Sequence, residues 1–113
     1  MRERVVSVGV ENCFVSEITL AELYYGASKS GREKHFRDVD FIASHFLVLP
    51  IRPILDVFGE IRYQLEKRGN SLDDFDLLIG CTALKNNFIV VTHNVNHLSR
   101  IPNVEIEDWQ ENF

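Results

Sequence analysis

Residues 71–91 read SLDDFDLLIGCTALKNNFIVV, and this stretch decides the fold class. It begins with three aspartates, continues as an apolar segment of helical length and ends in the wholly apolar run Phe88–Val91. Such a short apolar run, bounded by polar residues, is typical of a strand that is buried on both faces. A helix that leads into a strand of this kind favours an α/β architecture.

The same alternation of helix and strand extends toward both ends of the chain. We expect helices over about 2–8, 16–27, 32–44, 53–68 and 71–86, and strands at 13–15, 46–49, 88–91 and 104–106. Short apolar strands separated by helices predict a parallel sheet covered on both faces, within one domain that spans residues 1–113. Ligand sites in such sheets collect beyond the carboxyl ends of the strands.

The composition narrows the class of protein. Apolar residues make up 45% of the 113 residues, which fits a folded chain and not a disordered one. No apolar run approaches the roughly 20 residues that span a bilayer, and the first residues lack the apolar stretch of a secretory signal. The expected location is therefore the cytoplasm, without membrane attachment. Cys13 and Cys81 lie among apolar residues, which fits two buried free thiols, although a disulfide between them stays open.

The net charge of −5 argues against a protein that coats nucleic acid by general electrostatic attraction, since such proteins are usually basic. It is compatible with a nuclease whose carboxylates hold a divalent cation, because the cation supplies the positive charge that phosphate needs. It fits an ordinary metabolic enzyme equally well.

Glu22 is the first candidate for chemistry. It follows an expected strand, and in a helix it shares a face with Ile18 and Tyr25. A carboxylate in apolar surroundings needs a cation or hydrogen-bond donors, which favours a metal ligand. Taken alone, Glu22 fits a solvated glutamate near a helix start better.

The aspartates at the start of the helix 71–86 form the second candidate. Ser71 and Asp74 resemble a capping box, and acidic residues in a first turn complement the helix dipole, which explains Asp73 and Asp74. Helix capping explains Asp76 less well, because Asp76 directly precedes the apolar body of the helix and lies on the same stripe of its surface as Gly80. This stripe predicts a close approach to the sheet. Converging carboxylates there would suit Mg²⁺ or Mn²⁺, and Asp76 is the strongest single candidate.

The segment Thr92–His97 leaves the strand 88–91 at the place where a ligand site is expected. A zinc site built on His93 and His97 lacks a third ligand nearby. Asn94 is the better candidate, either as an amide oxygen ligand or to orient a metal-bound water. Basic residues on the helix 53–68 would be able to touch phosphate, but they fit a solvated helix face better; they are Arg62, Lys67 and Arg68. The sequence has no glycine-rich phosphate loop, nucleophile elbow or CxxC pair.

Three blocks of the sequence resemble the VapC-type PIN-domain toxins, ribonucleases of bacterial toxin–antitoxin pairs. Phe14–Leu23 with Gly26 resembles the second motif of that family, and Asp73–Gly80 resembles the third. Val91–Asn94 together with Val104–Trp109 resembles the C-terminal segment. The blocks occur in the family's order, and the resemblance covers about residues 8–109.

The resemblance implies a three-layer α/β/α sandwich with a parallel sheet. It also implies a cluster of acids that binds Mg²⁺ or Mn²⁺, and cleavage of RNA phosphodiesters by metal-activated water. Members of the family commonly form dimers and are held inactive by a cognate antitoxin protein. RNA, an antitoxin and a second copy of the chain are therefore the expected partners.

The site residues carry over by position. Glu22 and Asp76 match the family's metal-binding carboxylates, and Asn94 occupies a catalytic position where many members have aspartate. Asp74, with Asp73 and Thr92 beside it, is expected to support these residues.

The family's chains begin with a short strand that ends in Asp-Thr-Asn, and that aspartate binds metal. Here Met1–Arg4 resembles the family's second helix, so we expect the first strand and one carboxylate ligand to be absent. Metal affinity should then fall and the activity of this form would be doubtful. The neighbouring strands would expose unpaired edges and recruit a strand from a second copy.

Two further functions stay open. One is a non-catalytic PIN remnant that binds an antitoxin or associates with itself. The other is an unrelated small α/β enzyme whose acids serve only as helix caps.

Overall fold

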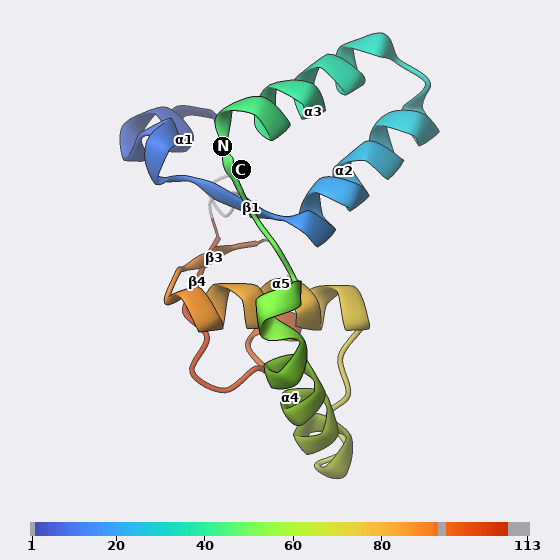
Figure 1. Cartoon of the computed structure of the whole chain (residues 1–113), viewed down its shortest axis with the longest axis vertical. Coiled ribbons are helices and arrows are strands. Elements are labelled where there is room, and N and C mark those ends of the chain that lie inside the picture. The colour runs from blue at the N-terminus through green and yellow to red at the C-terminus, as the bar shows by residue number, and fades with distance from the viewer. Residues whose placement is uncertain (1, 93–94, 109–113) are drawn as a thin grey trace. The chain divides into compact units, whose positions relative to one another are not determined.

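The computed structural model describes residues 2–92 and 95–108, and it divides the chain into two compact units, Met1–Pro50 and Ile51–Phe113 (Figure 1). Each unit has its own helices and its own pair of parallel strands. The single domain expected from the length of the chain stays a prediction. In the described part of the chain, no helix is long and apolar enough to cross a membrane.

The first unit is a helical hairpin packed on two strands. Strands β1 and β2 pair in parallel, with Val15 opposite Val48, and helices α2 and α3 pack against each other (Figure 1). The elements are α1 (Arg2–Val8), η1 (Val10–Asn12), β1 (Phe14–Ser16), α2 (Glu17–Ser30), α3 (Glu33–His45) and β2 (Leu47–Leu49).

The boundaries of α2 follow from capping. Ser16 is the N-cap, as its position after an apolar run predicts, and its Oγ accepts a hydrogen bond from the Thr19 N–H at 2.9 Å. The helix continues three residues beyond the expected end at Ala27, because the left-handed residue that stops it is Gly31, with φ 67°. The Tyr24 hydroxyl donates to Asp40 Oδ1 at 2.8 Å and ties α2 to α3.

The second unit contains the main hydrophobic core, which α5 and the elements around it enclose. Its elements are η2 (Arg52–Ile54), α4 (Leu55–Lys67), α5 (Asp74–Asn86), β3 (Val90–Val91), α6 (Val95–Leu98) and β4 (Ile106–Glu107). The buried cluster consists of Ile54, Ile61, Leu65, Leu77, Cys81, Ala83, Val90, Leu98 and Ile101.

Strand β3 is shorter and more exposed than its apolar sequence predicts. Only Val90 and Val91 form the strand, which pairs in parallel with β4, and the Val90 N–H donates to the Glu105 carbonyl at 2.8 Å. Val90 is buried, whereas Ile89 and Val91 are 46% and 37% exposed. Side chains alternate along a strand, so the neighbours of a core residue face away from the core. The expectation of a strand buried on both faces over 88–91 is wrong for Ile89 and Val91.

Parallel pairing in both units confirms the α/β class with parallel strands. The two cysteines are free thiols, as expected, with Cys81 buried and Cys13 partly buried.

Gly80 makes the close approach that its place in the helix predicts, but not to a sheet. A Cβ atom at Gly80 would collide with Ile101 Cδ1 and would lie 3.2 Å from Leu98 Cδ1. The close partner of α5 is therefore α6 and the turn after it. Gly59, on α4, has open space around the same position.

Replacing Gly80 and Gly59 separately by alanine should give opposite results. Alanine is the better helix former by about 0.5–1 kcal/mol, and Gly59→Ala should show this gain. Gly80→Ala must displace buried side chains, so its free energy of unfolding should lie about 1–3 kcal/mol below that of Gly59→Ala. Urea denaturation of both variants measures the difference. Equal stabilisation by both substitutions would contradict the packing of α5 against Ile101.

Candidate functional site

Three aspartates lie at the start of α5, and the structure gives each a different role. Asp73 is the N-cap of the helix, and its Oδ2 accepts hydrogen bonds from the N–H groups of Phe75 at 3.1 Å and Asp76 at 3.4 Å. The expected capping box of Ser71 and Asp74 is wrong, because the helix begins at Asp74 and the cap position falls on Asp73. The carboxylate of Asp73 is thus occupied by the backbone.

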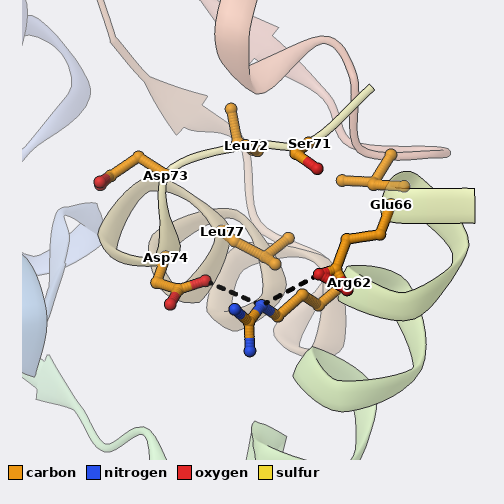
Figure 2. A pocket seen from close by; sticks show the side chains of 8 residues that line it. Arg62, Glu66, Ser71, Leu72, Asp73, Asp74 and Leu77 are labelled. Carbon is orange, nitrogen blue, oxygen red and sulfur yellow. Dashed lines mark ion pairs between the residues drawn. The ribbon is translucent and has the colours of Figure 1, made fainter. Parts of the chain in front are cut away.

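Asp74 forms an ion pair with helix α4. Its Oδ1 lies 3.3 Å from Nε of Arg62, and the same Nε lies 3.9 Å from Oε2 of Glu66 (Figure 2). About half of each of these side chains is exposed to solvent. The supporting role expected for Asp74 stays a prediction, and the structure adds a cationic partner that the sequence did not indicate.

Asp76 is the partly buried member of the run. Desolvation by burial raises the pKa of its carboxyl group, the charge of Asp73 raises it further, and His97 opposes both. The ionised form of Asp76 is therefore disfavoured by its surroundings in the described chain. A bound cation would reverse this preference, which is the behaviour expected of a metal ligand.

His97, on α6, is a neighbour of Asp76 that sequence reasoning considered only as a zinc ligand. Its charge acts on the Asp76 carboxyl group, although the two residues lie far apart in sequence. Nothing local in the sequence indicates this proximity, because it depends on the packing of α6 against α5.

Thr92 follows β3, at the carboxyl end of the strand, where a site is expected. Its backbone N–H donates to the Glu107 carbonyl at 3.0 Å and its side chain is partly buried. Asn94 and His93 lie outside the described residues, so the role expected for Asn94 stays a prediction.

Glu22 lies on α2 of the first unit, and its side chain is exposed. The prediction of apolar surroundings for Glu22 is wrong in part, because Ile18 is partly buried but Tyr25 is 68% exposed. Its role as a metal ligand with Asp76, which belongs to the second unit, stays a prediction.

The donor chemistry at Asp76 fits Mg²⁺ or Mn²⁺, which take carboxylate oxygens and keep several waters. Across residues 2–92 and 95–108, no group of three His, Cys, Asp or Glu side chains forms a preformed metal site. A thiol does not compete as a reactive group, because burial raises the pKa of Cys81 to about 11. The chemistry that the described residues support is cation binding at a carboxylate.

Asp73 and Asp76 should respond differently to neutralisation in metal-free buffer. Asp73→Ala removes the cap and should lower the free energy of unfolding by about 0.5–2 kcal/mol. Asp76→Asn should not lower it at pH 7, because the folded state raises the pKa of Asp76 and so disfavours its charge.

The pH dependence follows from the same shift. Between the ordinary pKa of 3.8 and the raised folded value, the native state binds the proton more tightly, so wild-type stability falls as pH rises through this window. As pH rises through this window, the free energy of unfolding of Asp76→Asn should therefore increase relative to that of the wild type. Below the window the two should be equal. Urea midpoints at several pH values in EDTA measure both effects, and a loss of stability in Asp76→Asn as large as in Asp73→Ala would assign Asp76 a structural role.

Comparison with known proteins matches this arrangement to one family. The family model described as the PIN domain matches residues 2–104. Ribonuclease VapC2 of Rickettsia felis is 35% identical over 99 residues, which are 86% of this chain and 74% of that protein. The tRNA(fMet)-specific endonuclease VapC of Salmonella typhimurium is 34% identical over 111 residues, which are 96% of this chain and 83% of that protein.

Solved structures agree with the sequence match. The DNA-bound VapBC of Salmonella typhimurium superimposes with a TM-score of 0.85 at 34% identity, covering 96% of this chain and 83% of that chain. VapBC-1 of nontypeable Haemophilus influenzae gives a TM-score of 0.81 at 33% identity, with the same coverage of 96% and 83%. These matches confirm the PIN-like α/β fold class. The chain belongs to the PIN-domain family, and within that family it is of the VapC type.

Proposed function

We propose that this chain is the toxin component of a type II toxin–antitoxin pair and cleaves RNA as an endoribonuclease that depends on Mg²⁺ or Mn²⁺. The observation that carries the proposal is the disfavoured charge of Asp76 in a chain whose relatives are named as ribonucleases. A carboxylate held partly buried at the start of a helix, with its pKa raised, is suited to a cation.

In this proposal Glu22 and Asp76 hold the cation, and Asn94 orients a water molecule next to it. When bound, the cation lowers the pKa of that water and stabilises the negative charge that develops on phosphate. Asp73 fixes the first turn of α5 through its hydrogen bonds to the Phe75 and Asp76 N–H groups, so the backbone that carries Asp76 is ordered before metal arrives. Two further residues support the site in this proposal: Asp74, which precedes Asp76 in the chain, and Thr92, at the end of β3.

The acidic character of the chain makes the cation necessary for this function. A net charge of −5 repels an RNA backbone, and the protein offers no general electrostatic attraction to compensate. Carboxylates without metal would also repel the scissile phosphate. The cation removes both obstacles, so substrate binding and catalysis should fail together when metal is removed.

The proposed partners are RNA as substrate and a cognate antitoxin protein as inhibitor. Several similar solved structures are VapBC assemblies, which supports an antitoxin partner for this chain. A homo-oligomer, including one in which copies exchange a strand, belongs to the same proposal. With RNA as substrate, the cytoplasm is the proposed location.

The proposal predicts cleavage of a mixed RNA substrate in Mn²⁺ or Mg²⁺, and no cleavage in EDTA. Asp76→Asn and Glu22→Gln should each lower the rate by at least about 100-fold, because each removes charge that holds the cation. Gel analysis of end-labelled RNA, with folding checked by circular dichroism, measures the rates.

Two matched variants control for loss of charge alone. Asp38→Asn and Glu60→Gln neutralise exposed acids on α3 and α4 and should cleave like the wild type. Metal-dependent cleavage that survives in Asp76→Asn would remove Asp76 from the site. No cleavage by the wild type, combined with tight binding of an antitoxin, would leave a non-catalytic binding protein in place of the nuclease.

A further inference from the structure

We propose that Arg62 and Arg100 clamp the segment 71–74 at two points, Asp74 and Ser71, and thereby position Asp76 at the start of α5. The clamp itself is a property of the second unit. Its consequence for catalysis rests on the proposed nuclease function.

The segment needs external support because of its charge. Three carboxylates at positions 73, 74 and 76 lie close together in sequence and repel one another, and Asp73 alone caps the helix through its side chain. The chain enters this segment from the end of α4 through Gly69, whose φ is 67°, without regular secondary structure between Arg68 and Asp73. A helix start of this kind frays unless groups outside the helix hold it.

Arg62 holds the segment from the side of α4. Its Nε lies 3.3 Å from Asp74 Oδ1 and 3.9 Å from Glu66 Oε2 (Figure 2). Glu66 is one turn along the same helix, so it directs the Arg62 side chain toward the gap between α4 and α5. The result is a chain of three charges that ties the body of α4 to the first residue of α5.

The ion pair between Arg62 and Asp74 matters because a cavity lies next to the segment. The cavity has a volume of about 280 Å³, and its lining includes Arg62, Leu65, Ser71, Asp73, Asp74 and Leu77. The hollow leaves this side of the segment without close packing, whereas Leu72 and Leu77 pack into the hydrophobic core. The side chain of Arg62 extends beside the hollow to reach Asp74, so the ion pair restrains Asp74 there (Figure 2).

Arg100 holds the segment at Ser71. Its Nη1 donates to the Ser71 carbonyl at 2.7 Å, across 29 residues of sequence. Arg100 is partly buried, and its neighbour Ile101 is buried in the core against Gly80. The anchor point is therefore fixed to the core of the second unit, and a charged donor makes a stronger bond to a carbonyl than a neutral one.

These contacts also indicate whether Arg62 pairs with carboxylates or is available to bind phosphate. Its guanidinium faces two carboxylates, so it serves the acid-rich helix start and is not placed as a free phosphate contact. Arginine does not lose its proton at physiological pH, so the clamp does not depend on pH in that range. Arg62 and Arg100 are positioning residues that act on Asp76 through Asp74 and Ser71.

Amide hydrogen exchange of the metal-free protein tests the clamp without reference to activity. Arg62→Gln and Arg100→Gln should each speed exchange of the amides in the first turns of α5, including Leu77, by about 2- to 10-fold. Amides in the middle of α4 should not change. Arg62→Lys should restore most of the protection, since an ammonium group also pairs with Asp74.

Two further variants make the result specific. Arg37→Gln breaks an exposed ion pair with Glu33 on α3 and should leave α5 unchanged. Asp74→Asn should reproduce Arg62→Gln, and the double variant should add nothing to either. Unchanged exchange in α5 for both Arg62→Gln and Arg100→Gln would overturn the proposal.

The catalytic consequence has its own readout. Arg62→Gln should lower kcat for RNA cleavage by about 3- to 10-fold and leave KM and its salt dependence unchanged. A raised KM with a weaker salt dependence would instead make Arg62 a phosphate contact and overturn its positioning role. If the wild type cleaves no RNA, the proposed function fails, while the exchange measurements still decide on the clamp.

Discussion

The crowding of carboxylates at the start of α5 is the constraint that shapes the second unit. Asp73, Asp74 and Asp76 fall within four residues, and the helix dipole alone cannot offset their mutual repulsion. Three separate interactions hold this segment: the N-cap hydrogen bonds of Asp73, the ion pair of Asp74 with Arg62, and the hydrogen bond from Arg100 to the Ser71 carbonyl. Burial and the charge of Asp73 raise the pKa of Asp76, so ionisation of its carboxyl group has a cost. We infer that the cost is retained because a cation offsets it.

The relation between stability and function is visible in α5. One face of the helix packs so closely on Ile101 and Leu98 that a larger residue than glycine at position 80 must displace their side chains. That contact fixes the axis of the helix, while the charged first turn beside a cavity is held by polar contacts that reach solvent. The closely packed part of the helix and the part held by polar contacts are thus adjacent.

Much of the fold could be predicted because its signals are local. Ser16 and Gly69 mark helix ends by their own conformational preferences, and the helix boundaries lie within a few residues of those expected. The length of β3 could not be predicted, because it depends on β4, whose paired residues lie sixteen positions further along the chain. The choice of Asp73 over Ser71 as cap could not be predicted either, since both residues suit that position and the contact of Arg100 with Ser71 spans 29 residues. For the candidate site, the sequence alone singles out Asp76, whose role as a metal ligand stays a prediction, whereas its neighbour His97 depends on the packing of α6.

We propose that the Asp76 carboxylate binds a divalent cation. Titration of Mn²⁺ into the wild type, Asp76→Asn and Asp38→Asn, with free Mn²⁺ followed by electron paramagnetic resonance, tests it most directly. The wild type and Asp38→Asn should bind Mn²⁺ alike, and Asp76→Asn should bind it at least about 10-fold more weakly. Equal binding by Asp76→Asn and the wild type, or no binding by the wild type, would contradict the proposed metal site.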